Sequence, residues 1–152
     1  SIANNDPSAD YPSACLALNA VIHTNERKIE ASNFFKGMFE TALKKGELIE
    51  SVEFQIPEKS SYQKYPNPAS RYAIVGVYVA KHKTGVNVAV TGAKPCVYND
   101  KELAKALENS FSSNSLSGAE VNSSDMNSDI HASSEYRASL VVTQAKKAVE
   151  AC

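Results

Sequence analysis

The chain of 152 residues is 43% hydrophobic, which is enough for one ordinary core, so we expect one domain or one domain with an appendage. Its 16 basic and 17 acidic residues give a formal net charge of -1, which favours neither nucleic acid nor an anionic membrane surface as a partner. No apolar run approaches the ~18 residues of a membrane-spanning helix, and the first residues lack the plan of a signal peptide.

Residues that commonly carry chemistry are scattered. The cysteines, Cys15, Cys96 and Cys152, form no Cys-x-x-Cys pair, which suits reduced thiols in the cytoplasm and excludes an iron–sulfur or zinc site supplied by this chain alone. The histidines are far apart, and neither a Gly-x-Ser-x-Gly turn nor a glycine-rich phosphate loop is present. By itself the sequence therefore predicts an α+β domain with no catalytic residue and no metal site.

The opening stretch, Ser1 to Pro12, is rich in residues that shape a backbone and poor in residues that fill a core. Asp6 before Pro7 predicts a helix cap with proline in the first turn, and Asp10 with Pro12 offers a second start. With either start, the free N–H groups at the helix entrance could hold phosphate or ribose oxygens. A capped helix on a surface loop is the plain alternative.

Helical spacing then continues to about Leu18, after which the hydrophobic pattern alternates. The apolar side of the predicted helix is made of Tyr11, Cys15, Leu16 and Leu18. Two runs, 20–24 and 27–31, flank Asn25-Glu26 and predict a β-hairpin in which Asn25 takes a turn position that tolerates positive φ.

Asn33 predicts the cap of a short helical turn whose large side chains belong to the core. These side chains are Phe34, Phe35, Met38 and Phe39. Residues 48–57 alternate as a strand should and end at Pro57. The apolar markers of that strand are Val52, Phe54 and Ile56.

Three further strands are predicted over 61–66, 72–81 and 86–91. Together they imply an antiparallel meander of three or four strands, and helices must cover its apolar face. The first of these helices is predicted over 101–108, with Asp100 in its capping pair.

The rest of the chain predicts one more helix after a polar segment. Residues 109–128 are rich in serine and asparagine, which is typical of a loop or a flexible connector. Asp129 or a neighbour starts the last helix, predicted over 130–151, with Arg137 facing away from its apolar side.

Five motifs, taken in order, resemble one family. They are Ser1-Ile-Ala-Asn-Asn-Asp-Pro-Ser-Ala-Asp-Tyr-Pro12, Asn33-Phe-Phe-Lys-Gly37, Gly46-Glu-Leu-Ile49, Asn67-Pro-Ala-Ser-Arg-Tyr-Ala-Ile-Val-Gly76 and Asn127-Ser-Asp-Ile-His-Ala-Ser-Ser-Glu-Tyr-Arg137. They span nearly the whole chain and resemble the FAD-binding medium subunit of molybdenum hydroxylases of the carbon monoxide dehydrogenase and xanthine dehydrogenase type. In that family a Thr-Ile-Gly-Gly turn, whose amides hold the FAD pyrophosphate, comes directly before the first motif, and this chain begins just after it.

The resemblance implies two parts: residues 1–55 as the end of the second FAD-binding subdomain, and residues 56–152 as a CO dehydrogenase flavoprotein C-terminal-like domain. The implied fold is α+β, with a three- to four-stranded antiparallel sheet covered by helices. In the family, electrons pass from a molybdopterin-binding large subunit through two [2Fe–2S] clusters of a small subunit to FAD, and then to an external acceptor. FAD is the cofactor implied for this chain, and the other two subunits are its implied partners.

The resemblance also implies residues that touch FAD. Asp10 falls on the acidic position that bonds a hydroxyl of the FAD sugar chain, and a carboxylate accepts such a bond strongly. Ser1 and Ile2 are expected to line the pyrophosphate side. Tyr72 falls where a side chain covers the isoalloxazine ring, and a strand aromatic in the core is the alternative for it.

A lysine near the flavin is harder to place. Many relatives carry one just before the segment that includes Tyr72, but the ungapped placement puts Pro66 there, so Lys64 is the candidate. A cation at that place would favour the anionic reduced flavin and tune its potential. A solvated strand lysine is the alternative.

The chain lacks the Thr-Ile-Gly-Gly turn and the N-terminal FAD domain of the family, so by itself it is expected neither to hold FAD nor to turn over a substrate. A non-catalytic α+β assembly domain, which docks onto a partner subunit and binds no cofactor, is the alternative function.

Overall fold

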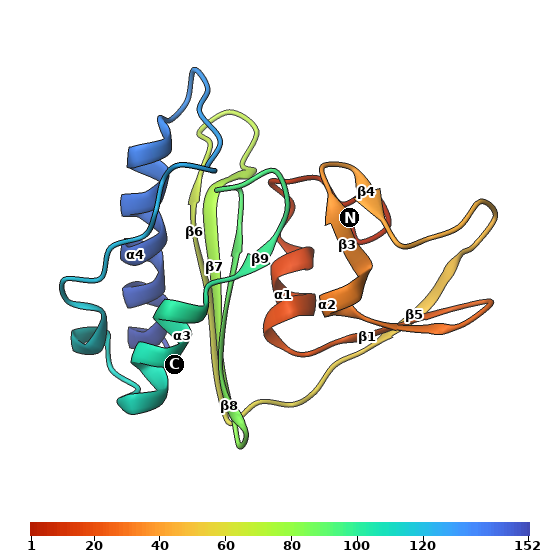
Figure 1. Cartoon of the computed structure of the whole chain (residues 1–152), viewed down its shortest axis with the longest axis horizontal. Helices are drawn as coiled ribbons and strands as arrows, with labels where there is room; N and C mark the ends of the chain where they lie inside the picture. Colours follow the sequence, from red (N-terminus) through yellow and green to blue (C-terminus); the bar gives the residue numbers. More distant parts are fainter.

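A four-stranded antiparallel sheet forms the centre of the fold in the computed structural model, which describes residues 1–152 (Figure 1). Its strands are β6 (Lys59–Pro66), β7 (Ala73–His82), β8 (Gly85–Thr91) and β9 (Tyr98–Asn99), in that order across the sheet. Each strand pairs antiparallel with the next one along the chain. The predicted α+β meander is therefore confirmed.

Helices cover both faces of this sheet. α3 (Lys101–Asn109) and α4 (Ser134–Glu150) lie on one face, and α1 (Tyr11–Ala17) lies on the other (Figure 1). Because both faces are covered, β7 is buried along almost its whole length, a position that suits its many valines. The Asp100 carboxylate accepts a hydrogen bond of 3.0 Å from the Leu103 amide, which confirms the predicted cap of α3. None of the helices combines the length and apolar character that crossing a bilayer requires.

The polar segment between α3 and α4 is anchored to the core. It contains a 3₁₀-helix, η1 (Ser113–Leu116), and the side chains of Leu116 and Met126 are buried in the cluster that the sheet forms with α4. The prediction of a loop over 109–128 is correct, but its flexible alternative is wrong. Two buried apolar side chains are enough to hold the segment against the core. The average composition of the segment does not reveal them, because most of its residues are polar.

Arg137 is the largest departure from the predicted pattern of α4, because it is 4% exposed where it was expected to face away. Its Nη1 donates hydrogen bonds of 2.7 Å to the carbonyl of Ile74 and 3.0 Å to that of Gly92. Its Nη2 pairs with the Asp129 carboxylate at 2.7 Å. Asp129 therefore serves this arginine, and Ser133 caps α4 in its place.

The first part of the chain forms two small sheets beside the central one. Its elements after α1 are β1 (Val21–Thr24), β2 (Lys28–Glu30), α2 (Ala31–Phe34), β3 (Phe35–Gly37), β4 (Glu40–Thr41) and β5 (Ile49–Glu53). One sheet has the order β2-β1-β5, and β3 pairs with β4 in the other. The predicted hairpin is confirmed as β1 and β2. Asn25 does not take positive φ, since Asn5, Asn19, Phe39 and Arg71 are the non-glycine residues that do.

A second hydrophobic cluster joins this part to the central sheet. Its largest buried side chains from the first part are Ile22 and Phe34. Ala80 and Ala89 reach it from β7 and β8, on the face of the sheet that also carries α1. The central sheet is thus shared by two cores, one on each face.

Several apolar side chains predicted for the core or as strand markers face solvent instead. Asn33 lies inside α2, whose N-cap is Glu30, and the chain turns into β3 directly afterwards. The cluster expected to follow it is therefore broken, and only Phe34 is fully buried. The exposed members of the predicted sets are Tyr11, Met38, Phe39, Phe54 and Ile56. Phe54 and Ile56 lie beyond Glu53, where β5 ends, so the strand predicted over 48–57 extends too far.

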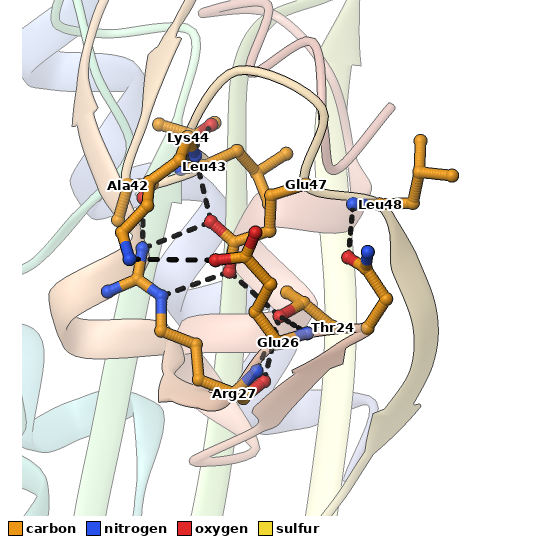
Figure 2. A network of polar contacts seen from close by, with 10 residues as sticks. Thr24, Glu26, Arg27, Ala42, Leu43, Lys44, Glu47 and Leu48 are labelled. Atoms are coloured by element: carbon orange, nitrogen blue, oxygen red, sulfur yellow. Dashed lines mark hydrogen bonds and ion pairs between the residues drawn. The ribbon is translucent and has the colours of Figure 1, made fainter.

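A buried carboxylate closes the loop between β4 and β5 (Figure 2). Glu47 accepts hydrogen bonds of 2.9 and 3.1 Å from Arg27 Nε and Nη2, 2.8 Å from the Lys44 amide and 2.8 Å from Thr24 Oγ1. The bond from Arg27, followed by that from the Lys44 amide, lowers the pKa of Glu47 to about 2. This glutamate belongs to the third motif in the family resemblance, and its place in the fold is structural.

Candidate functional site

The site begins where the opening loop enters α1. The helix starts at Tyr11, so the second of the two predicted starts is correct. Asp10 itself has helical φ and ψ of -74° and -42°, and its side chain makes no capping hydrogen bond. Asp6 also fails to cap a helix, because its Oδ1 accepts a hydrogen bond of 2.8 Å from the Ser8 amide in a local turn. The Asp10 carboxylate is therefore free to turn toward the central sheet.

Two residues at the end of β8 fix the opening loop. Thr91 Oγ1 lies 3.0 Å from the carbonyl oxygen of Pro7 and 2.8 Å from that of Ala9. The Gly92 amide donates a hydrogen bond of 2.7 Å to the same Pro7 carbonyl. Gly92 has φ of +81°, and a Cβ there would lie 2.5 Å from the carbonyl oxygen of Ile74, so only glycine fits.

Two side chains of β6 hold the Asp10 carboxylate. The Tyr62 hydroxyl donates a hydrogen bond of 2.5 Å to Oδ1, and Lys64 Nζ donates one of 2.8 Å to Oδ2. Tyr62 and Lys64 are two positions apart on one strand, so their side chains leave the same face of the sheet. Burial of the Tyr62 ring, together with the hydrogen bond and negative charge of Asp10, raises the pKa of Tyr62 far above its ordinary range. The phenol consequently stays protonated and acts as a donor.

The loop between β6 and β7 forms the opposite rim. Asn67 Oδ1 accepts hydrogen bonds of 2.9 and 3.2 Å from the amides of Ala69 and Ser70, and the Asn67 amide donates one of 2.8 Å to the Tyr72 carbonyl. Arg71 has φ of +65°, a left-handed conformation that costs a non-glycine residue ~1–2 kcal/mol. The tight turn places Arg71 and Tyr72 at the surface beside Asp10.

These elements enclose a pocket of about 330 Å³. Its lining residues are Ser1, Ser8, Ala9, Asp10, Tyr11, Lys64, Ser70, Arg71 and Tyr72. The structure therefore brings Ser1, Asp10, Lys64 and Tyr72 together, although they are up to 71 positions apart in the sequence. Ile2 is half-buried against the second hydrophobic cluster and is not among the lining residues.

The alternatives left open for Tyr72 and Lys64 can now be judged. Tyr72 is 52% exposed, so it is not a core aromatic. Lys64 is 28% exposed and paired with Asp10, so it is not a freely solvated strand lysine. Sequence reasoning missed Arg71 and Tyr62. The alternation of β6 was the available signal for Tyr62, because it places Tyr62 beside Lys64.

The chemistry of the pocket is that of a binding site. It offers a carboxylate that accepts hydrogen bonds, two cations in Lys64 and Arg71, and an exposed aromatic face in Tyr72. No cysteine or histidine lines it. This combination suits a ligand that carries hydroxyl groups, negative charge and a flat ring.

The chain is similar to known proteins along most of its length. Residues 1–58 match the family model described as the FAD binding domain in molybdopterin dehydrogenase. The glyceraldehyde dehydrogenase medium chain of Sulfolobus acidocaldarius is 38% identical over 85 residues, which cover 52% of this chain and 30% of that protein. The nicotine 6-hydroxylase medium subunit of Paenarthrobacter nicotinovorans is 29% identical over 157 aligned positions, which cover 93% of this chain and 55% of that protein. The chain is therefore similar to the FAD-binding medium subunits of molybdenum hydroxylases.

The fold agrees with this similarity. The structure of reconstituted CO dehydrogenase from Oligotropha carboxidovorans superposes with a TM-score of 0.82 at 22% identity, over 97% of this chain and 57% of the other. The chain thus spans about half the length of the medium subunits that it matches.

Proposed function

We propose that residues 1–152 form one part of an FAD-carrying medium subunit and supply one wall of its flavin pocket. The observation that carries this proposal is the single pocket that gathers four of the five residues implied by the family resemblance: Ser1, Asp10, Lys64 and Tyr72. Residues from two distant stretches of the chain meet there, as contacts with a single FAD molecule require. Four residues scattered at random over the surface would not be expected to line one pocket.

Each residue has a role that fits its placement. Asp10 accepts a hydrogen bond from a hydroxyl of the FAD sugar chain, because its side chain lines the pocket and a carboxylate accepts such a bond strongly. Tyr72 covers a face of the isoalloxazine ring, since its own ring is exposed at the rim. Lys64 supplies positive charge close to the flavin, and Ser1 lies toward the pyrophosphate. Ile2, which does not line the pocket, supports Ser1 from the second hydrophobic cluster. The flavin, when bound, accepts electrons and passes them on.

The wider role follows the family. The medium subunit receives electrons from the [2Fe–2S] clusters of a small subunit, which are supplied in turn by a molybdopterin-binding large subunit, and delivers them through FAD to an external acceptor. Three unpaired cysteines support a reducing, cytoplasmic location. The larger hydrophobic cluster contains only residues from 74 to 149, which supports a division into residues 1–55, the end of an FAD-binding subdomain, and residues 56–152, a C-terminal-like domain.

The isolated chain is expected to be inactive, because it supplies one wall of the pocket and no glycine-rich turn for the pyrophosphate. A non-catalytic assembly domain is the competing function. The residues that the gene encodes before Ser1 separate the two: Thr-Ile-Gly-Gly directly upstream, with a further glycine-rich loop before it, supports the flavoprotein.

The decisive experiment uses the complete subunit, meaning this chain joined to the residues that its gene encodes before Ser1. After gel filtration it should retain one FAD, measured by its visible absorbance, and Asp10→Asn should weaken FAD binding by about tenfold, the value of one charged hydrogen bond. Asp125→Asn is the matched control, since Asp125 forms an equivalent pair with Lys94 at 2.7 Å outside the pocket. A complete subunit without flavin, or tight stoichiometric FAD binding by the 152-residue chain alone, would contradict the proposal.

A further inference from the structure

Tyr62 stands behind the pocket and touches it only through Asp10. It is absent from the lining residues, yet its hydroxyl forms the hydrogen bond of 2.5 Å to Asp10 Oδ1. Its ring packs on that of Tyr78 with centroids 6.0 Å apart and an angle of 28° between the planes. Stacking on Tyr78 therefore fixes the Tyr62 ring, and the Tyr62 hydroxyl bonds Asp10 Oδ1.

The backbone is shaped to admit this phenol. Gly76 of β7 faces Lys64 in the strand register, and a Cβ at Gly76 would lie 2.2 Å from the Tyr62 hydroxyl oxygen and 2.9 Å from Thr91 Cγ2. Any side chain there would displace either the Tyr62 hydroxyl or Thr91, which holds the opening loop. The absence of a side chain at Gly76 is what lets the ring reach Asp10.

We propose that Tyr62 is a positioning residue that presets the Asp10 carboxylate as an acceptor for a ligand hydroxyl, and that this arrangement selects a hydroxyl over any group that can only accept. The inference rests on the proposed function and names the chemistry that the Asp10 end of the pocket takes. Tyr62 acts through Asp10 and does not touch the ligand.

The selectivity follows from the two groups that already bond Asp10. The Lys64 ammonium can only donate, and the Tyr62 hydroxyl donates to Oδ1, so the Asp10 carboxylate accepts both bonds. The lone pairs that remain can only accept. A sugar hydroxyl, which donates, is therefore bound, whereas a phosphate or carbonyl oxygen at the same place would face an acceptor and be rejected.

The test measures discrimination between ligands in the complete subunit. FAD and FAD analogues that each lack one hydroxyl of the ribityl or ribose chain are titrated into flavin-free protein, and affinity is read from flavin fluorescence. In the unmodified subunit one deoxy analogue should bind about tenfold more weakly than FAD, which corresponds to ~1.4 kcal/mol. Tyr62→Phe should weaken FAD binding and reduce that difference, because Lys64 alone then holds the carboxylate. Gly76→Ala, which displaces the same hydroxyl, should do likewise.

Tyr78→Phe is the matched control. It removes a hydroxyl from the stacked partner ring and should leave the preference for the hydroxyl intact. Thermal unfolding monitors whether each variant folds, and Asp10→Asn with ¹³C-labelled tyrosine gives a second readout in the 152-residue chain, where the Tyr62 ring resonance should move and that of Tyr98 should not. A Tyr62→Phe subunit that discriminates as well as the unmodified one, or an unmoved Tyr62 resonance, overturns the inference and leaves the proposed function standing. An unmodified complete subunit that binds no FAD overturns both.

Discussion

Replacement of Arg137 by methionine tests how the two faces of the central sheet are connected. The variant keeps the length and most of the packing of the side chain and removes the guanidinium. Three hydrogen bonds are lost, to the carbonyls of Ile74 and Gly92 and to the Asp129 carboxylate. The same Gly92 donates its amide to Pro7, so the loss occurs at one of the two residues that hold the opening loop.

The expected cost can be assembled bond by bond. A buried carbonyl left without a donor costs ~1–3 kcal/mol, and this applies fully to Ile74. Gly92 keeps a second donor, Asn127 Nδ2 at 3.2 Å, so its share is at the lower end. Asp129 is 46% exposed, and water takes over much of its bonding. The total is about 2–4 kcal/mol, a large part of the ~5–15 kcal/mol that stabilises a typical domain.

Equilibrium urea unfolding followed by circular dichroism measures this loss directly, provided that the slope with denaturant stays constant. Lys147→Met on the exposed side of the same helix makes the same chemical change without removing a hydrogen bond, and it should stay within ~0.5 kcal/mol of the unmodified chain. Hydrogen exchange at the Gly92 amide should become faster in the Arg137 variant only. A loss below ~1 kcal/mol for Arg137→Met would refute the idea that this arginine joins α4 to the sheet.

Three further outcomes are expected. The pKa of Glu47 is lowered from 4.5 to about 2, so its contribution to stability is complete above pH 4.5 and is lost as the pH falls toward 2; Glu47→Gln should remove this component from an acid titration followed by circular dichroism. Leu116→Ala should cost ~2–5 kcal/mol in urea unfolding, because this fully buried leucine anchors the polar segment, and a smaller loss would mean that the segment is loose. Ile56→Ser should change stability by less than ~0.5 kcal/mol, since its side chain is 96% exposed, and a larger effect would show that the face is covered.

The sequence predicted the elements whose signals are local. Strand alternation and the capping carboxylate of Asp100 each depend on neighbours within a few positions, and the meander and α3 were found where expected. Whether a face is covered depends on distant parts of the chain. Phe54 and Ile56 show the difference, because the sequence alternates there but β5 ends at Glu53 and both side chains are exposed.

Polar residues were harder to place than apolar ones. A charged residue in a helix usually faces water, so periodicity assigned Arg137 to the exposed side. The carbonyls of Ile74 and Gly92, which accept its hydrogen bonds, lie far away in the sequence, and no local pattern predicts them. Asp10 was expected to bond the amides of its own helix, which is the common fate of an aspartate at that position. Instead its carboxylate accepts hydrogen bonds from Tyr62 and Lys64 of β6.

The candidate site was predictable in part. Ser1, Asp10, Lys64 and Tyr72 came from the family resemblance, and the structure adds that they share one pocket. Tyr62 has no counterpart in that list, because its importance lies in a contact between residues 52 positions apart. Only the fold brings such pairs together.

Ala80 and Ala89 belong to the central sheet, yet residues from the first part of the chain bury them. Unfolding of that first part would expose one face of the sheet to water. Unfolding of the sheet would remove the surface on which the first part packs. The two regions therefore denature together as one cooperative unit. A protease that cuts the exposed stretch around Ile56 would not separate the two pieces, because both contribute side chains to the second hydrophobic cluster.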